Sequence, residues 1–413
     1  MEKALLVPLS STVHGRDVSE IYKYHMELLR DLCYETLPLI TRVSDIEKFQ
    51  ERVSEAHVIL ALACTGGTKR LILHLTKFDK PIIIISHPTQ NSLASAIHAL
   101  TILRKRNYPA MIFHNVSEKN LPDLKKAIRV ADAVYSLRNK TVLLLGISRE
   151  WLEEEEYDLS RLERLLHINL QILDLETLVK EFQTSKPDEE VLRKFSKFKA
   201  KEITEKDIME SSRVYTLVKR LIDKHGAIAY GIRCFPFVLQ TNVTPCLAVS
   251  HSIDKGIIAA CEADLGALIS MMLASAVTGQ PVFMGNIEDI DENNLVIAHC
   301  TIATSLTDDL VLRSHFETGK SVGIAGIIQK NEPVTLIRIS NDFSRMLIIS
   351  GKVIEGTPWS ENFCRTQLRI RTKEPVNHLT ENPIGSHLVI IRGDYREELV
   401  ILARLLNLQI NTV

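Results

Sequence analysis

Three short stretches of the sequence carry residue types that could bind a metal ion or move a proton. In the first, Glu262 and Asp264 follow an apolar run that ends at Cys261, and an apolar helix is predicted to begin directly after them. Ligands of α/β proteins bind at the carboxyl ends of strands, where this turn would place both acids. Acidic residues are also common in the first turn of any helix, because they interact favourably with its dipole. The spacing leaves both explanations open.

The other two stretches carry histidine. His299 and Cys300 end one predicted strand, and His387 begins another. Neighbouring residues of a strand point to opposite faces, so a nucleophilic Cys300–His299 pair is disfavoured. A histidine at a strand end is often a hydrogen-bonded core residue, and a cysteine beside it is usually inert packing. The TGG run at 65–67 lacks the spacing of a phosphate-binding loop.

The elements that would position these residues alternate over the first two thirds of the chain. Continuous aliphatic runs are separated by amphipathic stretches, which indicates parallel strands covered on both faces by helices. A long charged region from Glu176 to Lys206 is predicted to be solvated surface. After about Phe283, short strands separated by Gly, Pro, Asn and Asp indicate antiparallel pairing. We predict three domains, at residues 1–137, 138–283 and 284–413.

Composition narrows the class of protein. The chain has 413 residues, of which 45% are hydrophobic and 24% charged, with a formal net charge of −1. Such a balance gives no field that would gather nucleic acid or an anionic membrane, so we expect neither as a partner. The first residues do not resemble a signal peptide, and no apolar stretch is long enough to span a membrane. The seven cysteines lack CxxC spacing, which is typical of reduced thiols in a cytoplasmic protein.

The same stretches, taken in order, resemble the L-fucose isomerase and L-arabinose isomerase superfamily, and most closely its fucose isomerase-like branch. The resemblance extends from about Gly231 to the C-terminus, and it rests on the order of several motifs. These read GIRCFPF, TPCLAVS, KGIIAACEAD, HFETG at 315–319, CRTQ at 364–367 and GSHLVIIRGDY at 385–395. The first half of the chain fits this superfamily in architecture only.

The resemblance implies a fold, a cofactor and a ligand set. The fold class would be α/β, with two Rossmann-like (flavodoxin-like) parallel-sheet domains and a β-rich C-terminal domain. The enzymes interconvert an aldose and a ketose with a divalent metal, commonly Mn²⁺. Glu262 matches the first acidic ligand, His387 the late histidine, and His299 a further histidine ligand of the arabinose isomerase branch. The resemblance also implies a homo-oligomer, a trimer or hexamer, in which the first domain closes a neighbouring subunit's site.

One position departs from the pattern of the superfamily. Where a second acid is expected after an aromatic strand, this chain has Gly285 and Asn286. Asn286 could offer a carbonyl oxygen to a hard metal ion, but it cannot accept a proton as a carboxylate does. Glu288 and Asp289 lie just beyond and would substitute if the chain turned back there.

The predicted function is a metal-dependent aldose–ketose isomerase that acts on an open-chain monosaccharide through an enediol-type proton transfer. A metal that chelates two sugar oxygens acidifies the C–H bond, and a carboxylate moves the proton. Catalytic roles fall on Glu262 and Asn286. Two alternatives stay open: a carbohydrate-binding or regulatory relative without catalysis, and a metal enzyme with another reaction, such as an epimerase or a lyase. The predicted substrate contacts are Arg365, Gln367, His315, Glu317 and Asn91, of which Asn91 also fits a simple helix cap.

Overall fold

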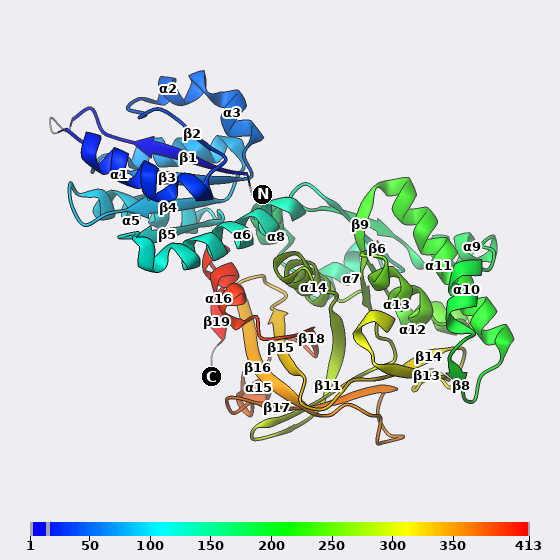
Figure 1. Cartoon of the computed structure of the whole chain (residues 1–413). Coiled ribbons are helices and arrows are strands. Elements are labelled where there is room, and N and C mark those ends of the chain that lie inside the picture. Colours follow the sequence, from blue (N-terminus) through cyan, green and yellow to red (C-terminus); the bar gives the residue numbers. More distant parts are fainter. Residues whose placement is uncertain (1–2, 14–16, 412–413) are drawn as a thin grey trace. The chain divides into compact units, whose positions relative to one another are not determined.

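The computed structural model describes residues 3–13 and 17–411, and it divides into two compact units. The N-terminal unit comprises Met1–Arg138 with two later segments, Ser160–His167 and Glu397–Gln409. The second unit comprises Asn139–Leu159, Ile168–Arg396 and Ile410–Val413. Figure 1 follows the chain through both units, and each is described by itself below.

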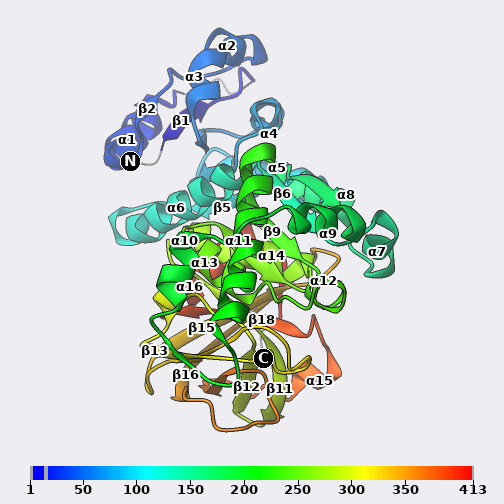
Figure 2. The same cartoon turned by 90° about the vertical axis from the view of Figure 1, so that its right-hand side faces the viewer.

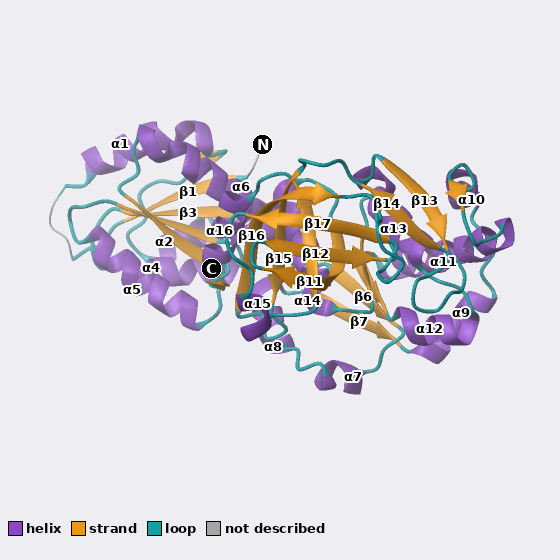
Figure 3. Ribbon diagram, turned by 90° about the horizontal axis from the view of Figure 1, so that it is seen from below, coloured by secondary structure: helices purple, strands orange, loops and turns teal. Residues whose placement is uncertain are grey.

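A five-stranded parallel sheet forms the centre of the N-terminal unit, in the order β2-β1-β3-β4-β5. This is the strand order of flavodoxin-like folds. Three of its strands are buried along their whole length, because helices lie on both sides of the sheet (Figure 3). The strands are β1 (Ala4–Leu9), β2 (Glu35–Thr36), β3 (Val58–Ala63), β4 (Ile82–Ser86) and β5 (Ala110–His114).

The helices of this unit follow the strands in the alternating manner that the sequence predicts. They are α1 (Ser19–Leu29), α2 (Val43–Lys48), α3 (Gln50–Glu55), α4 (Lys69–His74), α5 (Ser92–Lys105) and α6 (Leu121–Leu137), with most of α8 (Leu159–Leu166) and α16 (Arg396–Leu405).

The second unit begins with another parallel sheet, in the order β10-β9-β6-β7. Its strands are β6 (Thr141–Leu145), β7 (Asn169–Leu173), β9 (Ala227–Ile232) and β10 (Ile258–Cys261). The covering helices are α7 (Arg149–Glu154), α9 (Leu175–Gln183), α10 (Glu189–Phe195), α11 (Glu205–His225), α12 (Cys234–Thr241), α13 (Cys246–Asp254) and α14 (Leu265–Thr278). Figure 2 shows α11 beside α10 and α13, against which it packs.

Six antiparallel strands of the same unit close into a barrel. The sheet runs β15-β18-β11-β12-β17-β16, and β16 pairs again with β15, so no edge is left between them. The strands are β11 (Phe283–Asp291), β12 (Asn294–His299), β15 (Pro333–Ile339), β16 (Arg345–Glu355), β17 (Thr366–Thr372) and β18 (His387–Arg392), with β19 (Gln409–Asn411) beside β16. The helix α15 (His378–Glu381) precedes β18, and a small sheet is formed by β8 (Lys199–Ala200), β13 (Asp309–Arg313) and β14 (Gly323–Ile327).

The predicted fold class is confirmed: two parallel α/β sheets and an antiparallel β-rich C-terminal part are present. The charged region at 176–206 was wrongly expected to be only solvated surface. It contains α9 and α10, which bury Leu178, Phe182, Val191 and Phe195, because the apolar residues recur at helical spacing between the charges. The three-domain division stays a prediction: 137 lies next to the boundary at Arg138, while 283 falls inside the second unit. Within the described residues, no helix is long and apolar enough to cross a membrane.

Candidate metal centre

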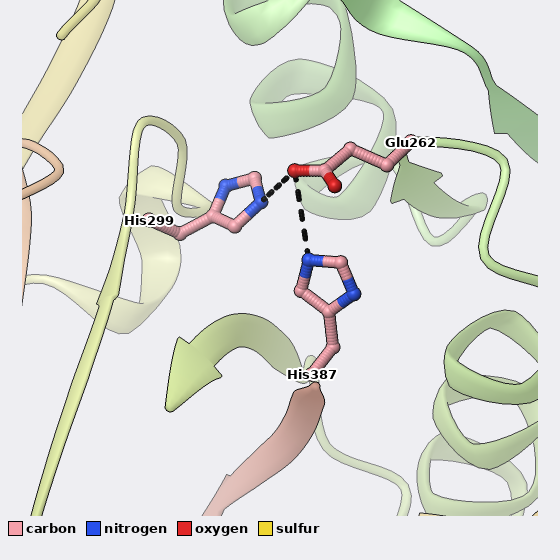
Figure 4. Close-up of side chains that lie close together, drawn as sticks. All are labelled: Glu262, His299 and His387. Atoms are coloured by element: carbon pink, nitrogen blue, oxygen red, sulfur yellow. Dashed lines mark ion pairs between the residues drawn. The ribbon is translucent and has the colours of Figure 1, made fainter. Parts of the chain in front are cut away.

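Glu262, His299 and His387 converge in the second unit, although they are far apart in the sequence. The Oε1 atom of Glu262 lies 3.7 Å from Nε2 of His299 and 3.5 Å from Nε2 of His387. Figure 4 shows both imidazole rings turned towards this carboxylate. One possible ligand atom from each residue lies within 4.8 Å of the others, and both histidines are buried. The geometry therefore brings together the three residues predicted to bind a metal ion.

The ends of three strands place these side chains. Glu262 follows β10, His299 is the last residue of β12, and His387 is the first of β18. Glu262 and Ala263 both adopt left-handed backbone conformations, with φ of 60° and 53°. Non-glycine residues enter this region at a cost of about 1–3 kcal/mol each, and such strain concentrates at functional sites. The strained turn directs the Glu262 carboxylate towards the two histidines before α14 begins.

Asp264 orients His387 from behind. It is the N-cap of α14, and its Oδ1 accepts a hydrogen bond from the backbone N–H of Ala267 at 2.9 Å. Its Oδ2 lies 2.9 Å from Nδ1 of His387. A proton on Nδ1, donated to Asp264, leaves the lone pair of Nε2 facing Glu262, which is the arrangement that metal-binding histidines need.

A buried arginine holds Asp264 in turn. Nη1 of Arg338 donates to both carboxylate oxygens, at 2.8 and 2.7 Å, and Nη2 donates to Oδ1 of Asn341 at 3.0 Å. The Arg338 side chain is only 2% exposed. At Gly385, a Cβ atom would lie 2.5 Å from Nε of Arg338, so only glycine leaves room for the guanidinium. Arg338, Asp264 and His387 thus form a chain of contacts that ends at the candidate metal centre.

The charges of this cluster shift the protonation of each member. Burial alone would raise the pKa of Glu262, but the two histidines hold it well below its usual range. The pKa of Asp264 is likewise lowered against the effect of burial, by the charge of Arg338 and by His387. Burial alone would lower the pKa of His387, yet Asp264 and Glu262 raise it to about 9. Without a metal ion, both ring nitrogens of His387 therefore carry a proton at neutral pH, and the ring is positively charged.

The unsatisfied nitrogen atoms of the two histidines fit a metal ion. Both ring nitrogens of His299 and Nε2 of His387 are buried without a hydrogen-bond partner. Buried polar atoms are nearly always hydrogen-bonded, so the two Nε2 atoms that face one carboxylate without a hydrogen bond need an explanation. Two imidazoles and a carboxylate are a donor set that suits a divalent ion such as Mn²⁺ or Zn²⁺.

The packing of β11 explains why the expected second acid is missing at position 285. A Cβ atom at Gly285 would lie 2.6 Å from Cγ2 of Ile297 and 3.2 Å from the carbonyl oxygen of Ala298. A carboxylate therefore cannot start from position 285 unless Ile297 moves. Asn286 pairs directly with His387 of β18, and directly opposed residues share one face of a sheet.

The acids that follow on β11 have different surroundings. The register between β11 and β12 shifts between Ile287 and Asp289, so Glu288 is the extra residue of a β-bulge. Burial raises the pKa of Glu288, and the charge of Glu317 raises it further, while His299 opposes the rise. The Asp289 side chain instead accepts a hydrogen bond from the N–H of Ile290, and the residue is exposed. Of the two, Glu288 is the one whose charge interacts with the site.

His315 and Glu317 lie beside the metal centre, in a region rich in cysteine. They line a nearly closed space of about 10 Å³ together with Glu262 and His299, which is the lower limit for one water molecule. Five cysteines line it as well: Cys234, Cys246, Cys261, Cys300 and Cys364. Burial opposes the charged form of both groups, but Cys364 and His315 together lower the pKa of Cys300, and Cys300 raises the pKa of His315. Cys300 therefore interacts with Cys364 and His315, and within the described residues the disfavoured pair with His299 is not formed.

The remaining predicted substrate contacts have internal hydrogen bonds or lie elsewhere. Arg365 is buried and donates to Ser314 and to Glu361. Gln367 uses both ends of its amide on the backbone at 359, 360 and 364. Asn91 is the N-cap residue of α5 in the N-terminal unit, without a side-chain cap bond. Their roles as substrate contacts stay predictions.

Asp264 and Arg338 are parts of the site that the sequence analysis did not assign. Asp264 was placed beside Glu262 at the end of a strand, but it was given no role of its own. Arg338 had a weak signal of its own, because it is a charged residue inside the otherwise apolar strand β15. A buried charge almost always has a partner, but nothing in the sequence says which residue that partner is.

A cavity of about 660 Å³ opens beside the metal centre. Glu262 and His387 line it, together with Trp151, Tyr157, Arg338 and Arg345. Small-molecule sites commonly have this volume and combine aromatic side chains with a few polar groups. The cavity is therefore large enough for a monosaccharide in contact with Glu262 and His387.

Comparison with known proteins points to one enzyme activity. No protein-family profile matches the chain. The chain is 23% identical over 440 aligned residues to the sulfoquinovose isomerases of Priestia aryabhattai and Priestia megaterium, with 98% of each chain covered. It is 22% identical over 460 residues to the sulfoquinovose isomerase of Alkalicoccus urumqiensis, with 99% of each covered. These matches confirm the prediction of an enzyme of the sugar isomerase class, whereas the fucose isomerase-like branch stays a prediction.

Proposed function

We propose that the chain is a metal-dependent aldose–ketose isomerase whose substrate is an open-chain hexose with a sulfonate group, such as sulfoquinovose. The observation that carries the proposal is the convergence of Glu262, His299 and His387, with buried ring nitrogens that lack partners. The choice of a sulfonated sugar comes from the names of the full-length relatives.

The chemistry requires a base that moves one proton between C1 and C2 of the sugar. A divalent ion, when bound, polarises the sugar oxygens and stabilises the negative charge that develops. Glu262 and the two histidines would hold it. Because Oε1 is the atom of Glu262 that faces both histidines, Oε2 is the atom left to accept the proton. Asp264 keeps Nε2 of His387 directed at the ion.

A second carboxylate would complete the proton transfer in place of the acid missing at position 285. Glu288 suits this role, because the bulge brings its charge into interaction with His299 and Glu317. Asn286, opposite His387, would supply a neutral amide where a carboxylate is expected, for a sugar hydroxyl or for the ion.

The test is the variant Glu262→Gln, assayed for bound metal and for isomerisation of a panel of aldoses that includes sulfoquinovose. We expect it to lose both Mn²⁺ and turnover, whereas Asp289→Asn, an exposed acid on the bulged strand, should keep both. Unchanged metal content together with unchanged turnover in Glu262→Gln would refute the proposal.

The absence of an acid at 285 favours one other candidate, a sugar-binding protein without catalysis. Equilibrium dialysis with sulfoquinovose, run beside an isomerisation assay in Mn²⁺, separates the two. Saturable binding without any ketose product would support the binding protein against the enzyme.

A further inference from the structure

The N-terminal unit has a cavity of its own that the proposed chemistry does not use. It has a volume of about 650 Å³ and lies at the carboxyl ends of β1 and β3. From these two neighbouring strands the sheet continues in opposite directions, to β2 on one side and to β4 and β5 on the other. Open parallel sheets bind ligands at such a switch point, in the crevice outside the strand ends. The cavity therefore lies where this kind of fold places a ligand.

The TGG run, which the sequence analysis left without a role, and Asn91, which it predicted as a substrate contact, meet in this cavity. The TGG run contributes Gly66 and Gly67, and Asn91 lines the cavity beside them. A Cβ atom at Gly67, whose φ is +78°, would lie 2.8 Å from Oγ of Ser11. One at Gly66 would lie 2.9 Å from Cβ of Asn91. The glycines thus allow the loops after β1, β3 and β4 to approach one another closely.

The charge of the cavity is positive. Lys69, Arg70 and His98 line it, and no acid is found among the described residues of its lining. Within the described residues, neither the partly buried Lys69 nor the exposed Arg70 has a carboxylate within 4 Å. Unpaired cations around a cavity attract an anionic ligand. Because the net charge of the whole chain is −1, this positive charge is a local feature of the cavity.

The base of the cavity is fixed by buried hydroxyl groups. Oγ of Ser95 accepts a hydrogen bond from the backbone N–H of Lys69 at 3.1 Å and lies 2.9 Å from Oγ1 of Thr68. Thr68 and Ser95 are both buried. The start of α4 is therefore tied to α5, so the backbone that carries Lys69 and Arg70 is held in place while their side chains stay free to reach a ligand.

We propose that this cavity binds the tetrahedral oxyanion group of a small molecule, namely a sulfonate. Lys and Arg side chains, with hydroxyl and amide groups, are the usual partners of such oxyanions. Phosphate shares this chemistry, and the proposed function favours sulfonate. Only the preference for sulfonate over phosphate rests on the proposed function.

The test measures binding to the full-length protein by isothermal titration calorimetry in EDTA, which excludes the metal centre. The probes are methanesulfonate, inorganic phosphate and, as an uncharged control, methyl glucoside. The double variant Lys69→Met/Arg70→Met is compared with Lys105→Met/Arg106→Met, which removes a neighbouring lysine and arginine at the far end of α5. We expect the first variant to lower methanesulfonate affinity by about tenfold or more and the second to leave it unchanged.

Three results would overturn the inference: equal losses in both double variants, binding of methyl glucoside as tight as that of methanesulfonate, or phosphate affinity about tenfold above that of methanesulfonate. The last would reassign the cavity to phosphate. Because the measurement needs neither metal nor turnover, its outcome is separate from that of Glu262→Gln. Isomerisation with no sulfonate binding would remove this site and leave the proposed function standing.

Discussion

The two units each contain a cavity of nearly equal volume, about 660 and 650 Å³, and the two differ in charge and in rigidity. The cavity of the second unit is lined by five acids: Glu155, Glu156, Glu262, Asp264 and Asp342. Its central groups are buried and already bound to one another. The cavity of the N-terminal unit has cations and no acid, and its charged side chains have no ion-pair partner within the described residues. The first arrangement suits a small cation held rigidly, and the second suits an anionic group on a mobile ligand.

The largest expected effect is on stability, and it tests how strongly the acidic cavity is pre-organised. Asp264→Asn leaves the buried Arg338 without its carboxylate, which should lower the free energy of unfolding by about 3–5 kcal/mol. Thermal denaturation measures it. Asp342→Asn serves as the control, because among the described residues its hydrogen bonds go to Ser340 and Ser344 in its own loop. A loss no larger than that of the control would mean that Asp264 and Arg338 do not depend on each other.

Should Asp264→Asn fail to fold, the variant Asp264→Asn/Arg338→Met removes the unpaired charge as well. We expect the double variant to regain stability while its metal affinity stays reduced by roughly 10–100-fold, as for other residues that orient a ligand. Normal metal affinity in a folded double variant would show that His387 needs no carboxylate at Nδ1.

The second effect is on turnover and asks which acid replaces the missing one. Glu288→Gln should lower kcat by roughly a hundredfold or more, the usual loss for a group that transfers a proton, without changing metal content. Asp289→Asn, one residue further along β11, should have no effect. Equal kcat values for the two variants would remove Glu288 from the mechanism.

A third prediction compares the loss of stability when one glycine of each unit is replaced by alanine. Gly285→Ala should cost about 1–3 kcal/mol, because its Cβ meets the buried Ile297 and the backbone of Ala298. Gly66→Ala should cost less, because its closest contact, with Cβ of Asn91 at 2.9 Å, is longer than the 2.6 Å contact at Gly285 and lies in an exposed loop. Urea denaturation of both variants measures the difference. The reverse order would mean that the N-terminal cavity is the more rigid of the two.

The smallest effect is the pH dependence of metal binding. The pKa of His387 is raised to about 9, so its proton must leave before Nε2 can bind an ion. Metal affinity should rise with pH by up to about tenfold per unit, or 1.4 kcal/mol, and level off above pH 9. The stability of the metal-free protein should change with pH in the opposite direction to metal affinity. The raised pKa of His387 stabilises the fold fully below about pH 6.5, and this contribution is lost as pH rises through 9.

Calorimetric titration in buffers of different ionisation enthalpy detects the released proton. We expect about one proton per Mn²⁺ at pH 7. In His387→Gln, any remaining binding should release fewer protons. A wild-type protein that binds Mn²⁺ at pH 7 without releasing a proton would contradict the raised pKa.

Sequence patterns predicted the elements better than the contacts between them. The continuous aliphatic run at 82–85 and the Gly-separated strands after 283 were sufficient for the fold class, because burial on both faces and antiparallel pairing leave different periodicities. His387 and Glu262 could be chosen from motif order. Three features could not be predicted. They are the closure of the barrel through β15 and β16, the ion pair between Asp264 and Arg338, and the clustering of five cysteines that are scattered in the sequence. Each depends on pairings between distant segments, for which local sequence carries no signal.

The contact between Asp264 and His387 joins residues 123 positions apart, and it closes only when α14 and the barrel strand β18 have both formed. A metal ion at this place would bind the folded chain and not the unfolded one. At a free concentration a hundredfold above its dissociation constant, it would add about 2.7 kcal/mol to the free energy of unfolding. The ion would then stabilise the contact between distant segments of the chain as well as take part in the reaction. Removing it with a chelator would lower the melting temperature without any covalent change to the chain.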